Sequence, residues 1–129
     1  MLTSSVKTRI ADYFNYILRD FYKETDKSIS RSIDEKIGII DDILRIFRYE
    51  IIGCDESGTQ LIHIFPKTYS DINIEKELKY VYYDIINGFY SSENRNDYKS
   101  KLEVFNKVLE ILGYEIHGYG EDCIIFSVN

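Results

Sequence analysis

Apolar side chains recur every three or four residues along much of the chain, and the clearest case is the segment 33–52. Its spacing places one row of apolar residues on a single helix face. Ile39, Ile43 and Ile46 form a second row about a quarter-turn away, so the apolar arc is wider than that of an ordinary surface helix. The pattern predicts a central helix with neighbours on two sides. The first row consists of Ile33, Ile37, Ile40, Leu44, Phe47 and Ile51.

Local signals predict both ends of this central helix. Ser32 and Glu35 have the spacing of a capping box, in which each side chain accepts a hydrogen bond from a backbone N–H at the helix start. Arg45 and Arg48 lie near the predicted C-terminal end, where the helix dipole favours positive charge. Gly53 is the expected left-handed stop.

Three further segments, 5–24, 74–90 and 98–112, show the same spacing and predict three more helices. Gly113 is the expected end of the last of them. The inward-facing residues are expected to be Val6, Ile10, Phe14, Ile17 and Phe21 in the first segment, Ile74, Leu78, Val81, Ile85 and Phe89 in the second, and Leu102, Phe105, Val108, Leu109 and Leu112 in the third.

Two short apolar segments predict strands. Residues 61–65 lie between a turn-rich stretch and Pro66 and are too short for a helix, and residues 114–128 have the pattern of a β-hairpin. Together they predict a small antiparallel sheet. The predicted fold is α+β, with about four helices packed around the helix 33–52, in a single domain that spans residues 1–129. No internal repeat is expected from the sequence.

The composition favours a small acidic protein of the cytoplasm. The formal net charge is −6, and acidic residues outnumber basic ones in both halves of the chain, which argues against binding to nucleic acid. Two cysteines are too few for the framework of a small secreted domain, and neither a signal peptide nor a membrane-spanning run is present. Abundant Ile, Tyr, Asn and Lys are typical of AT-rich coding, as in many bacteria and their phages.

Motifs for catalysis are missing from the sequence. It has no G-x-S-x-G elbow, no P-loop and no G-x-G-x-x-G phosphate cradle. Asp41 and Asp42 are adjacent on a predicted helix and point about 100° apart, and Asp41 is instead placed to pair with Arg45 one turn later. The sequence therefore predicts a non-enzymatic protein that needs no cofactor.

Cysteine and histidine residues leave one alternative open. Cys54, His63, His117 and Cys123 could form a small metal site or a Cys–His catalytic pair if the predicted strands are neighbours. Zinc sites usually contain a close pair such as C-x2-C, which this chain lacks. The leading expectation is that no metal is bound.

A second alternative comes from the order of elements after residue 61. Together with the preceding helix, the elements are a helix, a strand, two helices and a hairpin. This order resembles that of winged-helix DNA-binding domains. The resemblance implies that the recognition helix is 98–112, with Lys99, Lys101 and Lys107 facing phosphate. Against it, the same helix carries Glu103 and Glu110, and the would-be wing carries Glu121 and Asp122.

The predicted third helix carries the most informative candidate surface. With Val81 in the core, Tyr80, Tyr83, Asn87 and Tyr90 fall on the far side, and tyrosine is enriched at protein interfaces. The alternative is that these rings are packed at the edge of the core. Three acids of the central helix, Asp34, Asp41 and Asp42, are candidates to supplement the surface, and the alternative is that they form an ordinary solvated face.

The leading hypothesis is a small acidic binding protein that neutralises or regulates a macromolecular partner. Immunity proteins against bacterial toxins and phage-encoded inhibitors are examples of this type. Because opposite charges raise association rates, the expected partner is a basic protein such as a toxin or a nuclease, with no role for a membrane.

Overall fold

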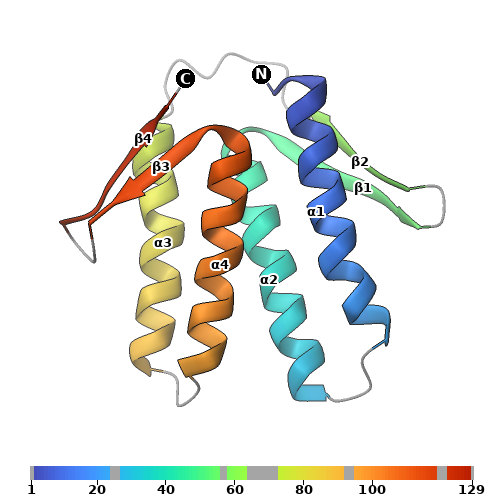
Figure 1. Ribbon diagram of the computed structural model, residues 1–129, viewed down its shortest axis with the longest axis horizontal. Helices are drawn as coiled ribbons and strands as arrows, with labels where there is room; N and C mark the ends of the chain where they lie inside the picture. Colours follow the sequence, from blue (N-terminus) through green and yellow to red (C-terminus); the bar gives the residue numbers. More distant parts are fainter. Residues whose placement is uncertain are drawn as a thin grey trace. The chain divides into compact units, whose positions relative to one another are not determined.

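Four helices and two small antiparallel sheets confirm the predicted α+β class (Figure 1). Contacts between Cα atoms divide the chain into two compact units, 1–67 and 68–129. The prediction of a single domain concerns how these units associate, and it stays a prediction. The computed structural model describes residues 2–23, 27–55, 58–63, 73–91, 95–118 and 122–128.

The first unit is a pair of antiparallel helices followed by a β-hairpin (Figure 1). Helix α1 spans Ser4–Lys23 and α2 spans Lys27–Ile46. Strand β1, Tyr49–Asp55, pairs antiparallel with β2, Gly58–His63. Helix α1 packs against β2 and α2 against β1, so the hairpin covers the helix pair.

The second unit has the same order of elements. Helix α3 spans Ile74–Ser91 and α4 spans Arg95–Leu112, and they run antiparallel (Figure 1). Strand β3, Tyr114–His117, pairs antiparallel with β4, Ile124–Ser127. Helix α3 packs against β4 and α4 against β3, which is the arrangement of the first unit.

The predicted single sheet is wrong in its pairing. Strand β2 pairs with β1, and the C-terminal hairpin forms a separate two-stranded sheet. The unpredicted strand β1 causes this difference, because it satisfies the hydrogen bonds of β2 that the C-terminal hairpin was expected to satisfy. Of the predicted strand 61–65, residues 64–65 lie outside the described residues, as do 119–121 at the C-terminal turn.

The predicted central helix 33–52 starts too late and ends too late. Helix α2 begins at Lys27, so Ser32 lies inside it and the expected capping box is absent. Arg48 adopts a left-handed conformation (φ 63°) and stops the helix before Gly53. The β-branched and aromatic run that follows then forms β1, since such residues favour an extended backbone.

The other three helices are confirmed with small shifts at their ends. Helix α1 begins at Ser4. Its N-terminal cap is Thr3, whose hydroxyl accepts a hydrogen bond from the Val6 N–H (3.2 Å). The Asn73 side chain caps α3 in the same way, through the Lys76 N–H at 3.0 Å. Helix α4 begins at Arg95 and ends before Gly113 (φ 85°), the predicted stop.

The apolar rows form the cores of the two units. In α2, both predicted rows contribute, since Ile40, Ile43 and Leu44 are fully buried. Among the described side chains of the core, none is polar or charged, so burial of apolar area stabilises both units. The other buried residues of the helices are Ile10, Phe14, Ile17, Ile33, Ile39, Leu78, Tyr82, Ile85, Ile86, Val104, Phe105, Val108, Leu109, Ile111 and Leu112.

A repeat in the sequence accompanies the repeated fold. Residues 33–53 and 98–118 align without a gap, and seven of these 21 positions are identical. Five further positions exchange one aliphatic residue or phenylalanine for another, as at Ile40 and Phe105. The identical pairs are Lys36 and Lys101, Leu44 and Leu109, Ile46 and Ile111, Tyr49 and Tyr114, Glu50 and Glu115, Ile51 and Ile116, and Gly53 and Gly118.

The aligned residues also have matching roles in the structure. Arg48 and Gly113 are both left-handed and both join the second helix of a unit to its first strand. The register agrees as well, because Tyr49 pairs with His63 and Tyr114 with Ser127 at the start of each hairpin. The prediction of no internal repeat is therefore wrong, and the chain consists of two copies of one ααββ unit.

Candidate partner-binding surface

One face of α3 is fixed by burial, and the tyrosine face lies away from it. Leu78, Ile85 and Ile86 are buried, so this side of the helix packs on the core. Tyr80, Tyr83 and Asn87 follow one another at the three- and four-residue spacing that places them on a second face. We call these three residues the tyrosine face.

Tyr80 is the most exposed aromatic residue of α3 among those described. Its side chain is 51% exposed, and the Lys76 Nζ lies 6.0 Å from the centre of its ring. A cation over an exposed ring contributes about 0.5–1 kcal/mol. The ring is thus held on the outer face by a neighbour one turn earlier, which reduces the entropy that binding would cost.

Tyr83 connects the tyrosine face to the core through a series of rings. It is half-buried, and its ring centre lies 6.0 Å from that of the buried Tyr82. Tyr82 in turn lies 5.8 Å from the ring centre of Phe105 on α4. Both predicted alternatives for the tyrosines therefore apply in part, since Tyr80 is at the surface and Tyr83 packs at the edge of the core.

The remaining predicted site residues have different positions. Asn87 is exposed on α3, and the side chain of Tyr90 lies outside the described residues. Asp34 and Asp42 are exposed on α2, in the first unit. Asp41 forms the expected ion pair one turn along that helix, with its Oδ2 3.4 Å from Arg45 Nε.

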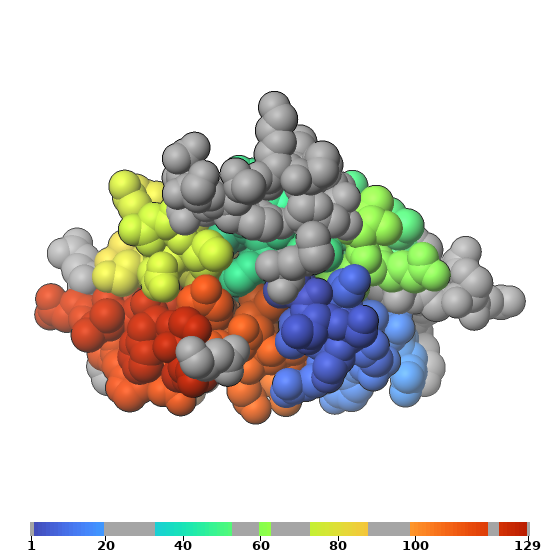
Figure 2. All heavy atoms as spheres, turned by 90° about the horizontal axis from the view of Figure 1, so that it is seen from above, coloured from blue at the N-terminus to red at the C-terminus, as the bar shows by residue number. Residues whose placement is uncertain are grey.

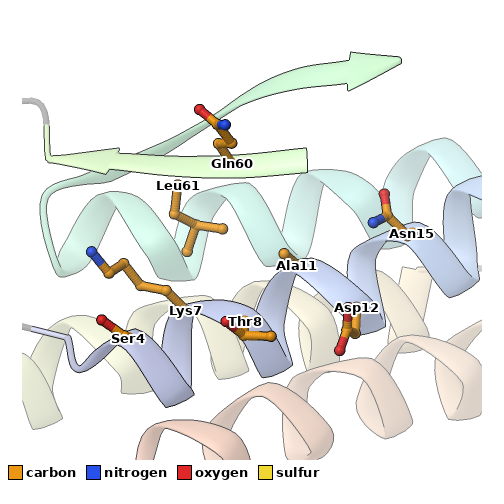
Figure 3. Close-up of a pocket in the computed structure, with 8 residues that line it drawn as sticks. All are labelled: Ser4, Lys7, Thr8, Ala11, Asp12, Asn15, Gln60 and Leu61. Atoms are coloured by element: carbon orange, nitrogen blue, oxygen red, sulfur yellow. The ribbon is translucent and has the colours of Figure 1, made fainter. Parts of the chain in front are cut away.

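Sequence reasoning missed a groove in the first unit, between α1 and β2. It has a volume of about 480 Å³. Leu61 points from β2 towards α1, whereas Gln60 points away from it and Asp12 lies on the side of α1 away from the strand (Figure 3). The eight residues that line it are Ser4, Lys7, Thr8, Ala11, Asp12, Asn15, Gln60 and Leu61.

The polar groups of this groove do not converge on one point. None of its eight described residues is a cysteine or a histidine. The Lys7 Nζ lies 6.0 Å from the centre of the Tyr49 ring, which belongs to β1. The groove therefore combines the apolar Leu61 with polar side chains that point in different directions.

The cysteine and histidine alternative gains no support from the described side chains. Cys123 is 1% exposed in the core of the second unit, whereas His117 is exposed with its Nε2 3.0 Å from Glu115 Oε2. Within the ranges that the structure describes, no group of three Cys, His, Asp or Glu side chains is arranged to hold a metal ion. The side chains of Cys54 and His63 are not among the described side chains.

The winged-helix alternative loses the sheet on which it depends, because β2 belongs to the first hairpin. The expected recognition helix also alternates its charges, since the exposed Lys99, Glu103 and Lys107 follow one another at four-residue spacing. Such a series favours neutralisation along the helix over contact with phosphate.

Comparisons with known proteins identify no relative. No family model, no curated protein and no solved structure matches the chain. Among the described helices, none is both long and apolar enough to cross a membrane.

Proposed function

We propose that the protein is a non-enzymatic binding protein that neutralises or regulates a protein partner, in the manner of an immunity protein or a phage inhibitor. The observation that carries this proposal is the tyrosine face, where the exposed Tyr80 lies beside the anchored Tyr83 and the exposed Asn87. Tyrosine binds well at interfaces because it adds a large contact area with few rotatable bonds and a polar end.

Charge supports the choice of partner. With a net charge of −6, the chain attracts basic proteins more strongly than acidic ones. A basic toxin or nuclease that acts in the cytoplasm fits this description. The exposed acids Asp34 and Asp42 are candidates to contribute to the same attraction.

Site-specific photo-crosslinking in the native host tests the proposal. A photoreactive phenylalanine analogue replaces Tyr80, and in a matched control it replaces Tyr16, which is 62% exposed on α1. We expect one discrete protein adduct from position 80 and none from position 16. Equal labelling from both positions, or no adduct from position 80, would contradict the proposal.

A double variant then separates binding from folding. Tyr80→Ala with Asn87→Ala removes two exposed side chains and the Lys76–Tyr80 contact, so the free energy of unfolding should fall by no more than about 1.5 kcal/mol. Binding of the crosslinked partner should weaken at least tenfold. A variant that stays folded and binds as tightly as the wild type would exclude the tyrosine face.

A further inference from the structure

Each hairpin has one face on its helices and one face towards solvent. In the first hairpin, Ile52 and Ile62 are both 39% exposed on the outer face. In the second, Ile124 is 60% exposed and Phe126 is 36% exposed. Atoms of β2 (green) and of β4 (dark red) reach the molecular surface in Figure 2. Both copies of the unit therefore expose apolar side chains on an outer sheet face.

The same cross-strand pair occurs on both outer faces. Glu50 lies opposite Ile62 in the first hairpin, and Glu115 lies opposite Phe126 in the second. Glutamate is depleted in strands, and an outward position on the surface imposes little demand from packing. Both hairpins therefore place a carboxylate beside an apolar residue at the same outward position.

The charge on the two hairpins has one sign. Among their described side chains, which include Glu50, Glu115 and Asp122, there is no lysine or arginine. In the second hairpin, the His117 Nε2 lies 3.0 Å from Glu115 Oε2 and its ring centre 5.1 Å from that of Phe126. These contacts hold the carboxylate and the aromatic ring side by side. A complementary ligand would carry basic and apolar groups in alternation.

The strands also offer backbone hydrogen bonds. Each described sheet has only two strands, so every strand has one edge without a partner strand in the described part of the chain. An extended peptide can add to such an edge, where its backbone supplies affinity and its alternate side chains contact one face.

We propose that the outer face and free edge of each hairpin bind an extended segment of a protein partner in which basic and apolar residues alternate. The basic residues would pair with Glu50 or Glu115, and the apolar residues would cover Ile62 or Phe126. The chain then has two equivalent sites, one in each unit. These sites are independent of the tyrosine face.

A titration of the isotope-labelled full chain with a short peptide of alternating Lys and Val tests the proposal by NMR. We expect saturable shifts in the amides of 49–52 and 60–62 and in those of 114–117 and 124–127, with two peptides bound per chain. A peptide of alternating Glu and Val, and one with the lysines and valines in separate blocks, should each bind at least tenfold more weakly. Equal binding of all three peptides, or shifts confined to other residues, would overturn the proposal.

Paired variants assign the sites. Ile124→Lys with Phe126→Lys should weaken binding at the second hairpin at least tenfold and leave the shifts of the first hairpin unchanged. Ile52→Lys with Ile62→Lys should do the reverse, and Tyr16→Lys, a charge change of the same kind on α1, should alter neither. Loss of binding at both hairpins in either variant, with the fold intact, would contradict two equivalent sites.

Two controls separate the other outcomes. The variant that carries Tyr80→Ala and Asn87→Ala should keep peptide binding. If the tyrosine face proves not to bind a partner, the proposal for the hairpins is therefore unaffected. If the hairpins do not bind the peptide, the proposal for the tyrosine face is likewise unaffected. Sedimentation should show that the full chain does not self-associate through the second hairpin, so Phe126→Lys should leave its sedimentation unchanged. Such association would mean that a second copy of the chain covers the face, and it would overturn the assignment to a partner peptide.

Discussion

The two units share one fold but differ where the second helix meets its first strand. The left-handed residue at this junction is Arg48 in the first unit and Gly113 in the second. The tyrosine that follows is Tyr49, which is 2% exposed and whose hydroxyl accepts a hydrogen bond from the Leu2 N–H at 3.1 Å. Its counterpart, Tyr114, is only half-buried and lies near Glu75 in the first turn of α3.

This difference shows which features the fold requires. The backbone must enter a left-handed conformation after the second helix, and either residue type does so, although arginine does so at a cost in strain. The following tyrosine interacts with the start of the first helix in both units, through a backbone N–H in one and near a carboxylate in the other. The junction is therefore the common element, and its chemistry is free to differ.

Matched cavity mutations should give the largest effects. Leu44 and Leu109 are equivalent residues and are 0% and 1% exposed. Leu44→Ala and Leu109→Ala should each lower the free energy of unfolding by about 2–5 kcal/mol, because each leaves a cavity in a core. Urea denaturation measures both values. A loss below about 1 kcal/mol in either variant would show that the two cores are not equivalent.

Tyr49→Phe should have the next largest effect. It removes the hydroxyl that binds the Leu2 N–H and leaves the packed ring in place. The free energy of unfolding should fall by about 0.5–1.5 kcal/mol, the usual net value of such a hydrogen bond. Amide exchange at Leu2 should accelerate, and unchanged stability together with unchanged exchange would contradict the contact.

Substitutions at the left-handed junction residue should change the free energy of unfolding by a smaller amount, with opposite signs in the two units. Gly113→Ala places a Cβ in the left-handed region and should destabilise the protein by about 1 kcal/mol. Arg48→Gly relieves the same strain in the first unit. Because glycine also raises the conformational entropy of the unfolded chain, the net stabilisation should be roughly 0.5–1 kcal/mol. Thermal denaturation tests both, and changes of the same sign would refute a shared left-handed junction.

Alkaline pH should test the environment of Tyr114 by a small effect on stability. Burial, and secondarily the negative charge of Glu75, raise the pKa of Tyr114. A raised pKa in the folded state adds stability below the pKa of the unfolded chain, about 10, and this stability is lost as the pH rises through the folded value. Stability should therefore fall less steeply above pH 10 in Tyr114→Phe than in the wild type, with Glu75→Gln between them. Identical slopes would contradict this environment.

Hydrophobic periodicity was sufficient to predict the helices but not the first strand. Phe47 and Ile51 continue the helical spacing of the preceding residues, so the pattern extended the helix through a segment that is a strand. The equivalent segment at Tyr114 was predicted correctly, because Gly113 marks the helix end there while Arg48 gives no such signal. Comparing the two halves of the sequence would have transferred the strand from Tyr114 to Tyr49.

The candidate surfaces were predictable to different degrees. The exposure of Tyr80 and the ion pair of Asp41 with Arg45 follow from helical spacing alone. The outer hairpin faces required strand register, which depends on the pairing of β1 with β2 and could not be read from apolar spacing. Burial of Tyr82, the ring that Tyr83 contacts, likewise involves Phe105, which belongs to another helix.

The claim of two equivalent ααββ units is tested most directly by cross-strand nuclear Overhauser effects in the full chain. We predict contacts that join Glu50 to Ile62 and Glu115 to Phe126, in two separate ladders. Contacts that instead join residues 58–63 to 114–117 or 124–127 in one sheet would contradict the account.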